Sequence, residues 1–176
     1  MVGGLLFILM ADWAAAGRAA TALGLGAPTA TPALIGLGVA AALLAVVGLG
    51  MRRKSTSTRA DVEQARRELL PETSREVRLF LLLTAAVGFG WEVLYRGFLL
   101  FYLQPRIGLA GAVVAAALAY GAAHGFKSRG QFAGSIAAAL AFTIGYAATW
   151  NLWWLILLHT GLPLLSLSAA RSRRRT

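Results

Sequence analysis

The sequence predicts an all-α, polytopic helical membrane protein with about six transmembrane spans. Of its 176 residues, 58% are hydrophobic and only 14% are charged, and the mean hydropathy is +0.67. Several apolar stretches approach the roughly 20 helical residues that are needed to cross the hydrocarbon core of a bilayer. The chain has no cysteine, which excludes disulfides, thiolate nucleophiles and cysteine metal ligands.

Two N-terminal spans are expected within residues 1–51. The first covers residues 3–20 and is interrupted by Asp12 and Arg18. No basic segment precedes it, so it is not predicted to be a cleaved signal peptide. The second covers residues 32–51 without a charge, and a basic run follows it directly.

Residues 52–78 are predicted to be a basic cytoplasmic linker, and residues 169–176 a basic cytoplasmic tail. Within the linker, residues 59–70 carry charges at helical spacing and predict a short surface helix. This helix either lies against anionic lipid headgroups or is a solvated connector.

Residues 79–168 are predicted to form a core of four further helices. The four spans are expected at residues 77–103, 108–124, 132–149 and 152–169. The first of these has 27 residues, about 40 Å as a straight helix at 1.5 Å per residue, so we expect it to tilt or to break near residues 88–90. Asn151 is predicted to cap the last helix.

Lysine and arginine gather on one side of this topology. The linker, the loop after the fourth span and the tail hold 14 of the 17 basic residues. Basic loops stay in the cytoplasm, so both termini are predicted to be cytoplasmic in a plasma membrane. Trp150, Trp153 and Trp154 would form an aromatic belt at the opposite interface. The net charge of +10 is therefore explained by topology and anionic headgroups, with no nucleic-acid partner.

The fourth span consists almost entirely of small residues. Gly121 and Gly125 form a G-x-x-x-G pair, and Gly130 and Gly134 form another. Such pairs let helix backbones approach closely in a membrane. The fourth span is therefore predicted to be central, with His124 facing its neighbours.

Four ionisable side chains lie within the apolar segments: Glu92, Arg96, His124 and His159. Ionisable groups at this depth cost a few kcal/mol each, so they usually mark a functional site. Glu92 and Arg96 are four residues apart, which places them on one helical face within ion-pairing reach. Taken alone, this pair also fits an internal salt bridge that only neutralises both charges.

The span ends place these groups at different depths. Glu92 and His159 are expected nearer the non-cytoplasmic side, and His124 near the cytoplasmic end. At 1.5 Å per residue the separation is about 10–15 Å along the membrane normal. A broken third span or shifted boundaries would be needed to bring the three side chains together.

Three segments in order, WEVLYRGFLL, YGAAH and LWWLILLH, resemble the motifs of the CPBP family of CAAX-protease and bacteriocin-processing membrane proteins. The motifs of that family are Glu-Glu-x-x-x-Arg, Phe-x-x-x-His and a later His-x-x-x-Asn. The resemblance covers about residues 79–168, half of the chain. It implies a CPBP-like helical core and an intramembrane endopeptidase that acts on a membrane-associated peptide or protein.

The resemblance also implies roles for individual residues. Glu92 matches the second glutamate and would activate water, Arg96 would orient it, and two histidines would position water and stabilise the oxyanion. The expected catalytic residues are Glu92, Arg96, His124 and His159, and the expected substrate-binding residues are Trp91 and Tyr120.

Two positions depart from the family motifs. Trp91 stands in place of the first glutamate, which is usually assigned as the general base, and Pro163 stands in place of the asparagine. Proline has neither a side-chain donor nor a backbone N–H for an oxyanion. The main alternative is therefore a catalytically impaired member that binds peptides, confers bacteriocin immunity or acts as a scaffold. A transporter would need a polar pathway, which few residues here could line.

No cofactor is expected. Glu92, His124 and His159 nevertheless combine one carboxylate and two imidazoles, which also suits zinc with an open coordination position. The three residues lie on separate spans without H-E-x-x-H spacing.

Overall fold

The computed structural model describes residues 2–53, 71 and 73–172, and within these ranges it consists of helices and their connections. The elements are α1 (Val2–Ala15), the 3-10 turn η1 (Ala20–Leu23), α2 (Thr31–Arg53), α4 (Ser74–Trp91), the π-helix η2 (Glu92–Phe98), α5 (Leu99–Ala123), α6 (Arg129–Thr149) and α7 (Trp153–Ser172). The all-α fold class is confirmed. The surface helix predicted at residues 59–70 lies outside the described residues.

The count of six spans is not confirmed. Among the described residues, three helical runs are long and apolar enough to cross a membrane: Thr31–Met51, Ser74–Ala123 and Arg129–Thr149. Gly3–Ala15 and Trp153–Ala169 are shorter apolar helices. The first predicted span does not continue to residue 20, because Gly17 adopts a positive φ of 64° and turns the chain toward η1.

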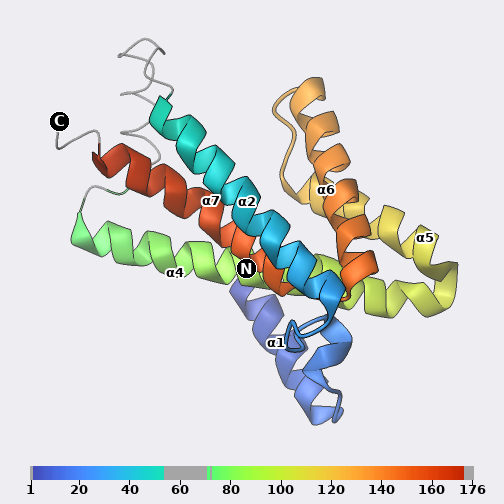
Figure 1. The fold of residues 1–176 in the computed structure, drawn as a ribbon. Coiled ribbons are helices and arrows are strands. Elements are labelled where there is room, and N and C mark those ends of the chain that lie inside the picture. Colours follow the sequence, from blue (N-terminus) through green and yellow to red (C-terminus); the bar gives the residue numbers. More distant parts are fainter. Residues whose placement is uncertain (1, 54–70, 72, 173–176) are drawn as a thin grey trace.

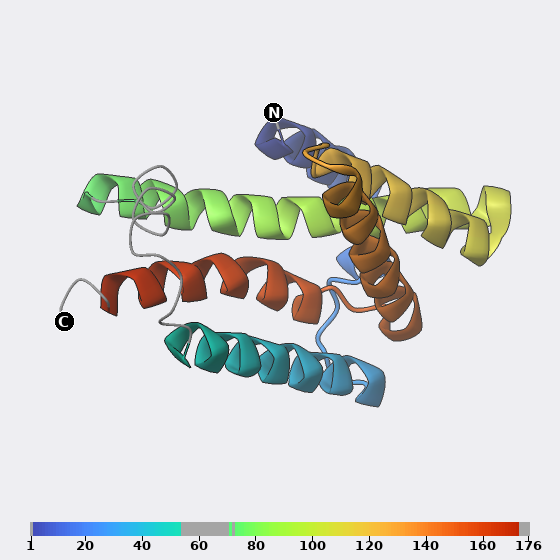
Figure 2. The ribbon, with the colours of Figure 1, turned by 90° about the horizontal axis from the view of Figure 1, so that it is seen from above.

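Helices α2 and α7 pack side by side and run in the same direction (Figures 1 and 2). Near their starts, Gly36 of α2 contacts the indole of Trp154, and further along Leu44 contacts Gly161 of α7. Glycine at each contact removes a side chain from the interface, so the two helices approach closely.

Helix α4 flanks α7 on its other side and runs in the opposite direction (Figure 2). A Cβ atom on Gly88 would lie 2.6 Å from the Cγ2 atom of Thr160, and one on Gly97 would lie 2.8 Å from the carbonyl oxygen of Leu23. These glycines therefore set how closely α4 and η2 approach α7 and η1. The start of α4 and the ends of α2 and α7 lie together at one end of this layer (Figure 2).

The run Ser74–Ala123 remains helical through Trp91, so the break expected at residues 88–90 is absent. The irregularity comes directly afterwards, in η2, where the N–H of Leu99 bonds to the carbonyl of Leu94 across five residues. Such π segments are rare and are often found at functional sites. The chain then reverses direction at Gly108, where φ is 73° and ψ is 167°. The arms on either side of Gly108 form a hairpin (Figure 1).

The returning arm of the hairpin packs against α6 and η2 through its small residues, whereas Val114 and Leu118 on its other face are exposed, so the prediction that it is central is not confirmed. Ala112, Ala116 and Ala117 of α5 are buried, and a Cβ atom on Gly121 would lie 3.0 Å from the Cα atom of Ile136 in α6. The close approach predicted for the other glycines is wrong. Gly125, Gly130 and Gly134 face open space, because Gly125 lies in the turn after α5 has ended and the other two lie in the first turns of α6.

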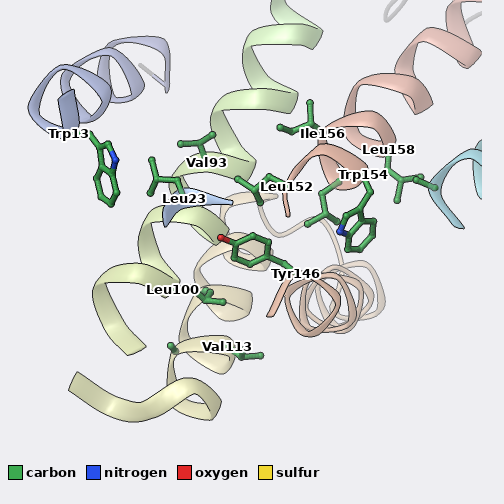
Figure 3. Packing of buried hydrophobic residues seen from close by; sticks show 14 residues of the cluster. Trp13, Leu23, Val93, Leu100, Val113, Tyr146, Leu152, Trp154, Ile156 and Leu158 are labelled. Atoms are coloured by element: carbon green, nitrogen blue, oxygen red, sulfur yellow. The ribbon is translucent and has the colours of Figure 1, made fainter. Parts of the chain in front are cut away.

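The largest buried apolar cluster joins most of the elements (Figure 3). It includes Trp13 of α1, Leu23 of η1, Val93 of η2, Tyr146 of α6 and Leu152 before α7. The cluster fixes η2 from one side, and this leaves the other side of η2 for polar groups.

Around the start of α7, two predictions need correction. Helix α7 begins at Trp153, so Asn151 lies one residue before the cap position; its side-chain oxygen still accepts the N–H of Trp153 at 3.1 Å, and its amide donates to the carbonyl of Gly26 at 3.0 Å. Trp154 is not part of an exposed belt, because it is only 6% exposed and packs against Gly36 and Gly145. Its position one residue after Trp153 turns it by about 100° around the helix, into the bundle.

Candidate active site

Glu92 and Arg96 form an ion pair inside the bundle, as their spacing predicts. Glu92 is 2% exposed and Arg96 is fully buried. The Nη1 group of Arg96 donates to the Oε2 atom of Glu92. The pair lies on η2, where the face opposite the apolar cluster points toward α5, α6 and α7.

Arg96 also contacts side chains of α5 and α6. Its Nε–H donates to the Oγ1 atom of Thr143 on α6 at 3.3 Å, and its guanidinium lies 4.1 Å from the ring centre of Tyr120. The Thr143 hydroxyl in turn donates to the carbonyl of Ala139 at 2.7 Å. The Nη2 group has no hydrogen-bond partner among the described residues. Arg96 is thus held by one charge, one hydroxyl and one aromatic face.

His159 meets the remaining oxygen of Glu92. Its Nδ1 atom lies 3.0 Å from Glu92 Oε1 and 2.8 Å from the Tyr120 hydroxyl, and that hydroxyl lies 3.4 Å from Glu92 Oε1. The His159 side chain is 23% exposed, compared with 2% for Glu92. The carboxylate is therefore buried behind an imidazole that remains partly accessible.

His124 also lies at this site, so the predicted separation of 10–15 Å is wrong. Its ring centre lies 6.4 Å from that of His159 and 4.8 Å from that of Tyr120. The hairpin explains the error: the chain runs about as far from Glu92 out to Gly108 as it does from Gly108 back to His124. The Nδ1 atom of His124 lies 3.0 Å from the carbonyl oxygen of Tyr120. In the described chain His124 is exposed, unlike the other three ionisable groups.

Trp91 packs at the edge of this cluster. Its ring lies edge-on to His124, with centres 5.1 Å apart, and to Tyr120, with centres 5.7 Å apart. Its indole N–H is buried without a partner among the described residues. Trp91 does not occupy the contact between Glu92 and His159.

A cavity of about 350 Å³ opens beside the polar cluster. Its polar lining comes from Glu92, Tyr120, His124, Ser135 and His159. Its apolar lining comes from Ala138, Ala139, Phe142, Leu155, Leu158, Leu162 and Pro163. Trp91 is not among the lining residues. The cavity is thus mostly apolar with a few converging polar groups, as small-molecule and peptide sites usually are.

The sequence did not predict two further residues at this site, Thr143 and Phe142. The ring centre of Phe142 lies 6.0 Å from the Arg96 guanidinium. Thr143 stands as a polar residue within an apolar span, and this was the available signal. The signal is weak, because threonine in a helix commonly bonds to the carbonyl four residues before it, as Thr143 also does. Phe142 carries no sequence signal that separates it from other core residues.

The zinc alternative lacks support in the geometry. Among the described residues, no group of three His, Asp or Glu side chains is arranged to hold a metal ion. Glu92 and His159 face each other in a hydrogen bond, and Arg96 takes the second carboxylate oxygen. Both oxygens of Glu92 are therefore already engaged.

A charged glutamate–arginine pair and two imidazoles inside a bundle of membrane-spanning helices define a class, that of membrane proteins with an ionisable site at depth. Within this class, residues 73–165 match the family described as Type II CAAX prenyl endopeptidase Rce1-like. The match covers more than half of the chain, and the protein belongs to this family. The resemblance to CAAX proteases is thereby confirmed. No curated protein and no solved structure matches the chain.

Membership has two consequences. The family implies a CAAX-type intramembrane endopeptidase, and it implies a membrane-associated peptide or protein as the substrate. The match begins at the first turn of α4 and ends within α7, so it contains every residue of the polar cluster.

Proposed function

We propose that the protein is an intramembrane endopeptidase that hydrolyses a peptide bond of a membrane-associated peptide or protein, using water activated by Glu92 and His159. The observation that carries this proposal is the 3.0 Å contact between Glu92 Oε1 and His159 Nδ1 beside the cavity. A carboxylate behind an imidazole is the arrangement with which hydrolases hold a histidine base in one orientation.

Glu92 acts through His159 in this proposal, rather than on water directly. Arg96 engages Oε2, and His159 and Tyr120 surround Oε1. The carboxylate accepts a hydrogen bond from Nδ1–H, which leaves the lone pair of His159 on Nε2, across the ring from this contact. Nε2 is then the base, and Arg96 orients Glu92.

The reaction proceeds in two steps. The oxygen of water bonds to the substrate carbonyl carbon while one of its protons passes to His159 Nε2, which gives a tetrahedral intermediate with a negatively charged oxygen. The carbon–nitrogen bond then breaks, and the proton on Nε2 passes to the departing amine. Glu92 stabilises the positive imidazolium between these steps.

His124 positions the water and stabilises the oxyanion. Its Nδ1–H donates to the Tyr120 carbonyl, because a carbonyl only accepts. Its Nε2 atom can therefore accept from water when neutral and donate to the oxyanion when protonated. The ring centres of His124 and His159 lie 6.4 Å apart, and both imidazoles line the same cavity, where we place the water.

The substrate is expected to occupy the mostly apolar cavity. Tyr120 lines this cavity, whereas Trp91 packs behind His124; we therefore assign substrate contact first to Tyr120. Pro163 lines the same cavity without a donor, so the oxyanion relies on histidine.

We further propose that both termini are cytoplasmic in a plasma membrane. The end of α2, the start of α4 and the end of α7 lie together (Figure 2), and the basic linker and tail adjoin these ends in the sequence. Anionic headgroups would neutralise this end of the bundle.

The test is peptide cleavage by the purified protein in proteoliposomes, with farnesylated C-terminal peptides and unmodified hydrophobic peptides as substrates. We expect the wild type to cleave, and we expect Glu92→Gln and His159→Gln to lose about 10³-fold or more in kcat. His159 is partly exposed, so its variant should keep its fold. Asp12→Asn, which removes an exposed carboxylate on α1, is the matched control and should cleave normally.

Full activity in folded His159→Gln would overturn the mechanism. No cleavage by a folded wild type that still binds these peptides would instead favour the impaired, peptide-binding alternative.

A further inference from the structure

Tyr120 stands where the family motif has phenylalanine, so this chain adds a hydroxyl to the site. We propose that this hydroxyl is a positioning group that, together with Glu92, holds His159 in the Nδ1–H tautomer. The proposal rests on the proposed function, because it is His159 in that tautomer that presents an Nε2 base. It assigns Tyr120 a role beyond contact with the substrate.

Three polar atoms meet at one point beside η2. The Tyr120 hydroxyl lies 2.8 Å from His159 Nδ1, His159 Nδ1 lies 3.0 Å from Glu92 Oε1, and the hydroxyl lies 3.4 Å from the same Oε1. Each atom is thus within hydrogen-bond reach of the other two.

With Glu92 ionised, all three atoms are satisfied when His159 carries a proton on Nδ1. An ionised carboxylate only accepts, so Glu92 Oε1 needs protons from its neighbours. With Nδ1 protonated, its proton points between the two oxygens, and the hydroxyl proton is free to point to Oε1. With Nδ1 bare, its lone pair would face a carboxylate oxygen at 3.0 Å with no proton between them. The carboxylate therefore requires a proton on Nδ1, and the hydroxyl supports this tautomer by accepting from Nδ1–H while its own proton is directed to Oε1.

The rest of Tyr120 fixes the hydroxyl in place. The residue is 7% exposed. The Arg96 guanidinium lies 4.1 Å from its ring centre, and the Tyr95 ring lies edge-on at 5.6 Å. Its carbonyl contacts His124 Nδ1 at 3.0 Å. Tyr120 thus contacts all four ionisable groups of the site, and its hydroxyl has little freedom to leave Nδ1.

The experiment separates the hydroxyl from the ring. Tyr120→Phe removes the hydroxyl and keeps the ring beneath Arg96, whereas Tyr120→Leu removes both. Tyr95→Phe is the matched control, because Tyr95 packs against Tyr120 and its hydroxyl is not among the groups in contact with His159 or Glu92. The chain has only two histidines, so ¹⁵N-histidine labelling of the whole protein gives two imidazoles, which His124→Gln assigns.

In the wild type we expect the ¹⁵N shifts of neutral His159 to show a protonated Nδ1 and a bare Nε2. Tyr120→Phe should move both shifts toward a mixture of tautomers and lower kcat about tenfold with KM unchanged, as expected for the loss of one hydrogen bond. Tyr95→Phe should leave the shifts and kcat as in the wild type.

Identical His159 shifts in the wild type and in Tyr120→Phe would overturn the proposal, whatever the cleavage rate. A raised KM with unchanged kcat and unchanged shifts would instead assign the hydroxyl to substrate contact. A wild type that cleaves no peptide would contradict the proposed function, and the ¹⁵N shifts of the same samples would still decide the role of Tyr120.

Discussion

The seven residues of η2 have two faces that are held by different physical means. On one face, Glu92 and Arg96 are held by an ion pair and by hydroxyl, imidazole and aromatic partners from three other helices. On the other face, Val93 and Gly97 pack into the apolar cluster of Figure 3. The polar face depends on matched partners, and the apolar face depends on shape.

This contrast indicates which substitutions the fold tolerates. Removing one member of a buried polar set leaves its partner desolvated and unpaired, which costs more than the interaction itself was worth. Removing or adding an apolar group changes packing, and neighbouring side chains can partly adjust. The predictions below test this contrast, beginning with the change expected to have the largest effect.

The strongest test of the polar face is Arg96→Leu. The change leaves the Glu92 carboxylate buried without its cation, so we expect a loss of about 3–5 kcal/mol in the free energy of unfolding. The double variant Glu92→Gln/Arg96→Leu removes both charges and should recover most of this loss without recovering cleavage. Denaturant unfolding in detergent micelles measures both effects. If Arg96→Leu is as stable as the wild type, the pair contributes nothing to the fold and the contrast fails.

The apolar face is tested by Gly97→Ala. The new Cβ would lie 2.8 Å from the Leu23 carbonyl oxygen, a backbone atom that cannot rotate away, so we expect a loss of about 1–3 kcal/mol. Cleavage per folded molecule should be unchanged, because the polar face is not touched. Gly134→Ala in α6, where the Cβ meets open space, is the control and should be neutral or slightly stabilising. Equal stability of the two variants would show that η2 has room to shift.

The contrast also explains which residues could be predicted. Glu92, Arg96, His124 and His159 stand out in the sequence because ionisable residues are rare in apolar spans, and the structure brings all four to one site. The spacing of Glu92 and Arg96 was also enough to predict their ion pair. The apolar face gives no such signal, because Val93 and Leu152 resemble every other apolar residue in a membrane span.

What the sequence could not supply was the residue at which the chain reverses: the third span was predicted to end at residue 103, whereas the helix continues to Gly108. The depth assigned to His124 was wrong because it was counted from span ends, whereas the hairpin at Gly108 returns the chain to the level of Glu92. The sequence also did not predict that the hydroxyls of Tyr120 and Thr143 contact the charged groups, because such contacts depend on how α5 and α6 pack against η2.

A smaller effect is expected at Pro163 of α7, where the cavity lacks a hydrogen-bond donor. Pro163 lines the cavity, and Pro163→Asn would place an amide there. Losing one oxyanion donor costs about 10²–10³ in kcat in a well-formed site; in this unadapted site we expect a gain of about tenfold. Pro163→Ala is the control, because it restores a backbone N–H to α7 without adding a side-chain donor. An equal gain in both variants would assign the effect to the helix backbone.

The smallest predicted effect compares two threonines with the same local bond. Thr143 and Thr160 each donate to the carbonyl four residues earlier at 2.7 Å, but only Thr143 also accepts from a buried arginine, at 3.3 Å. Thr143→Val should therefore cost about 1–2 kcal/mol, since it leaves the Arg96 Nε–H unsatisfied, whereas Thr160→Val should cost less than about 0.5 kcal/mol. Thr143→Ser keeps the acceptor and should stay near the wild type. Unfolding in micelles measures all three; equal losses in the two valine variants would mean that the arginine gains nothing from the hydroxyl, and that the polar face is less dependent on matched partners than its contacts indicate.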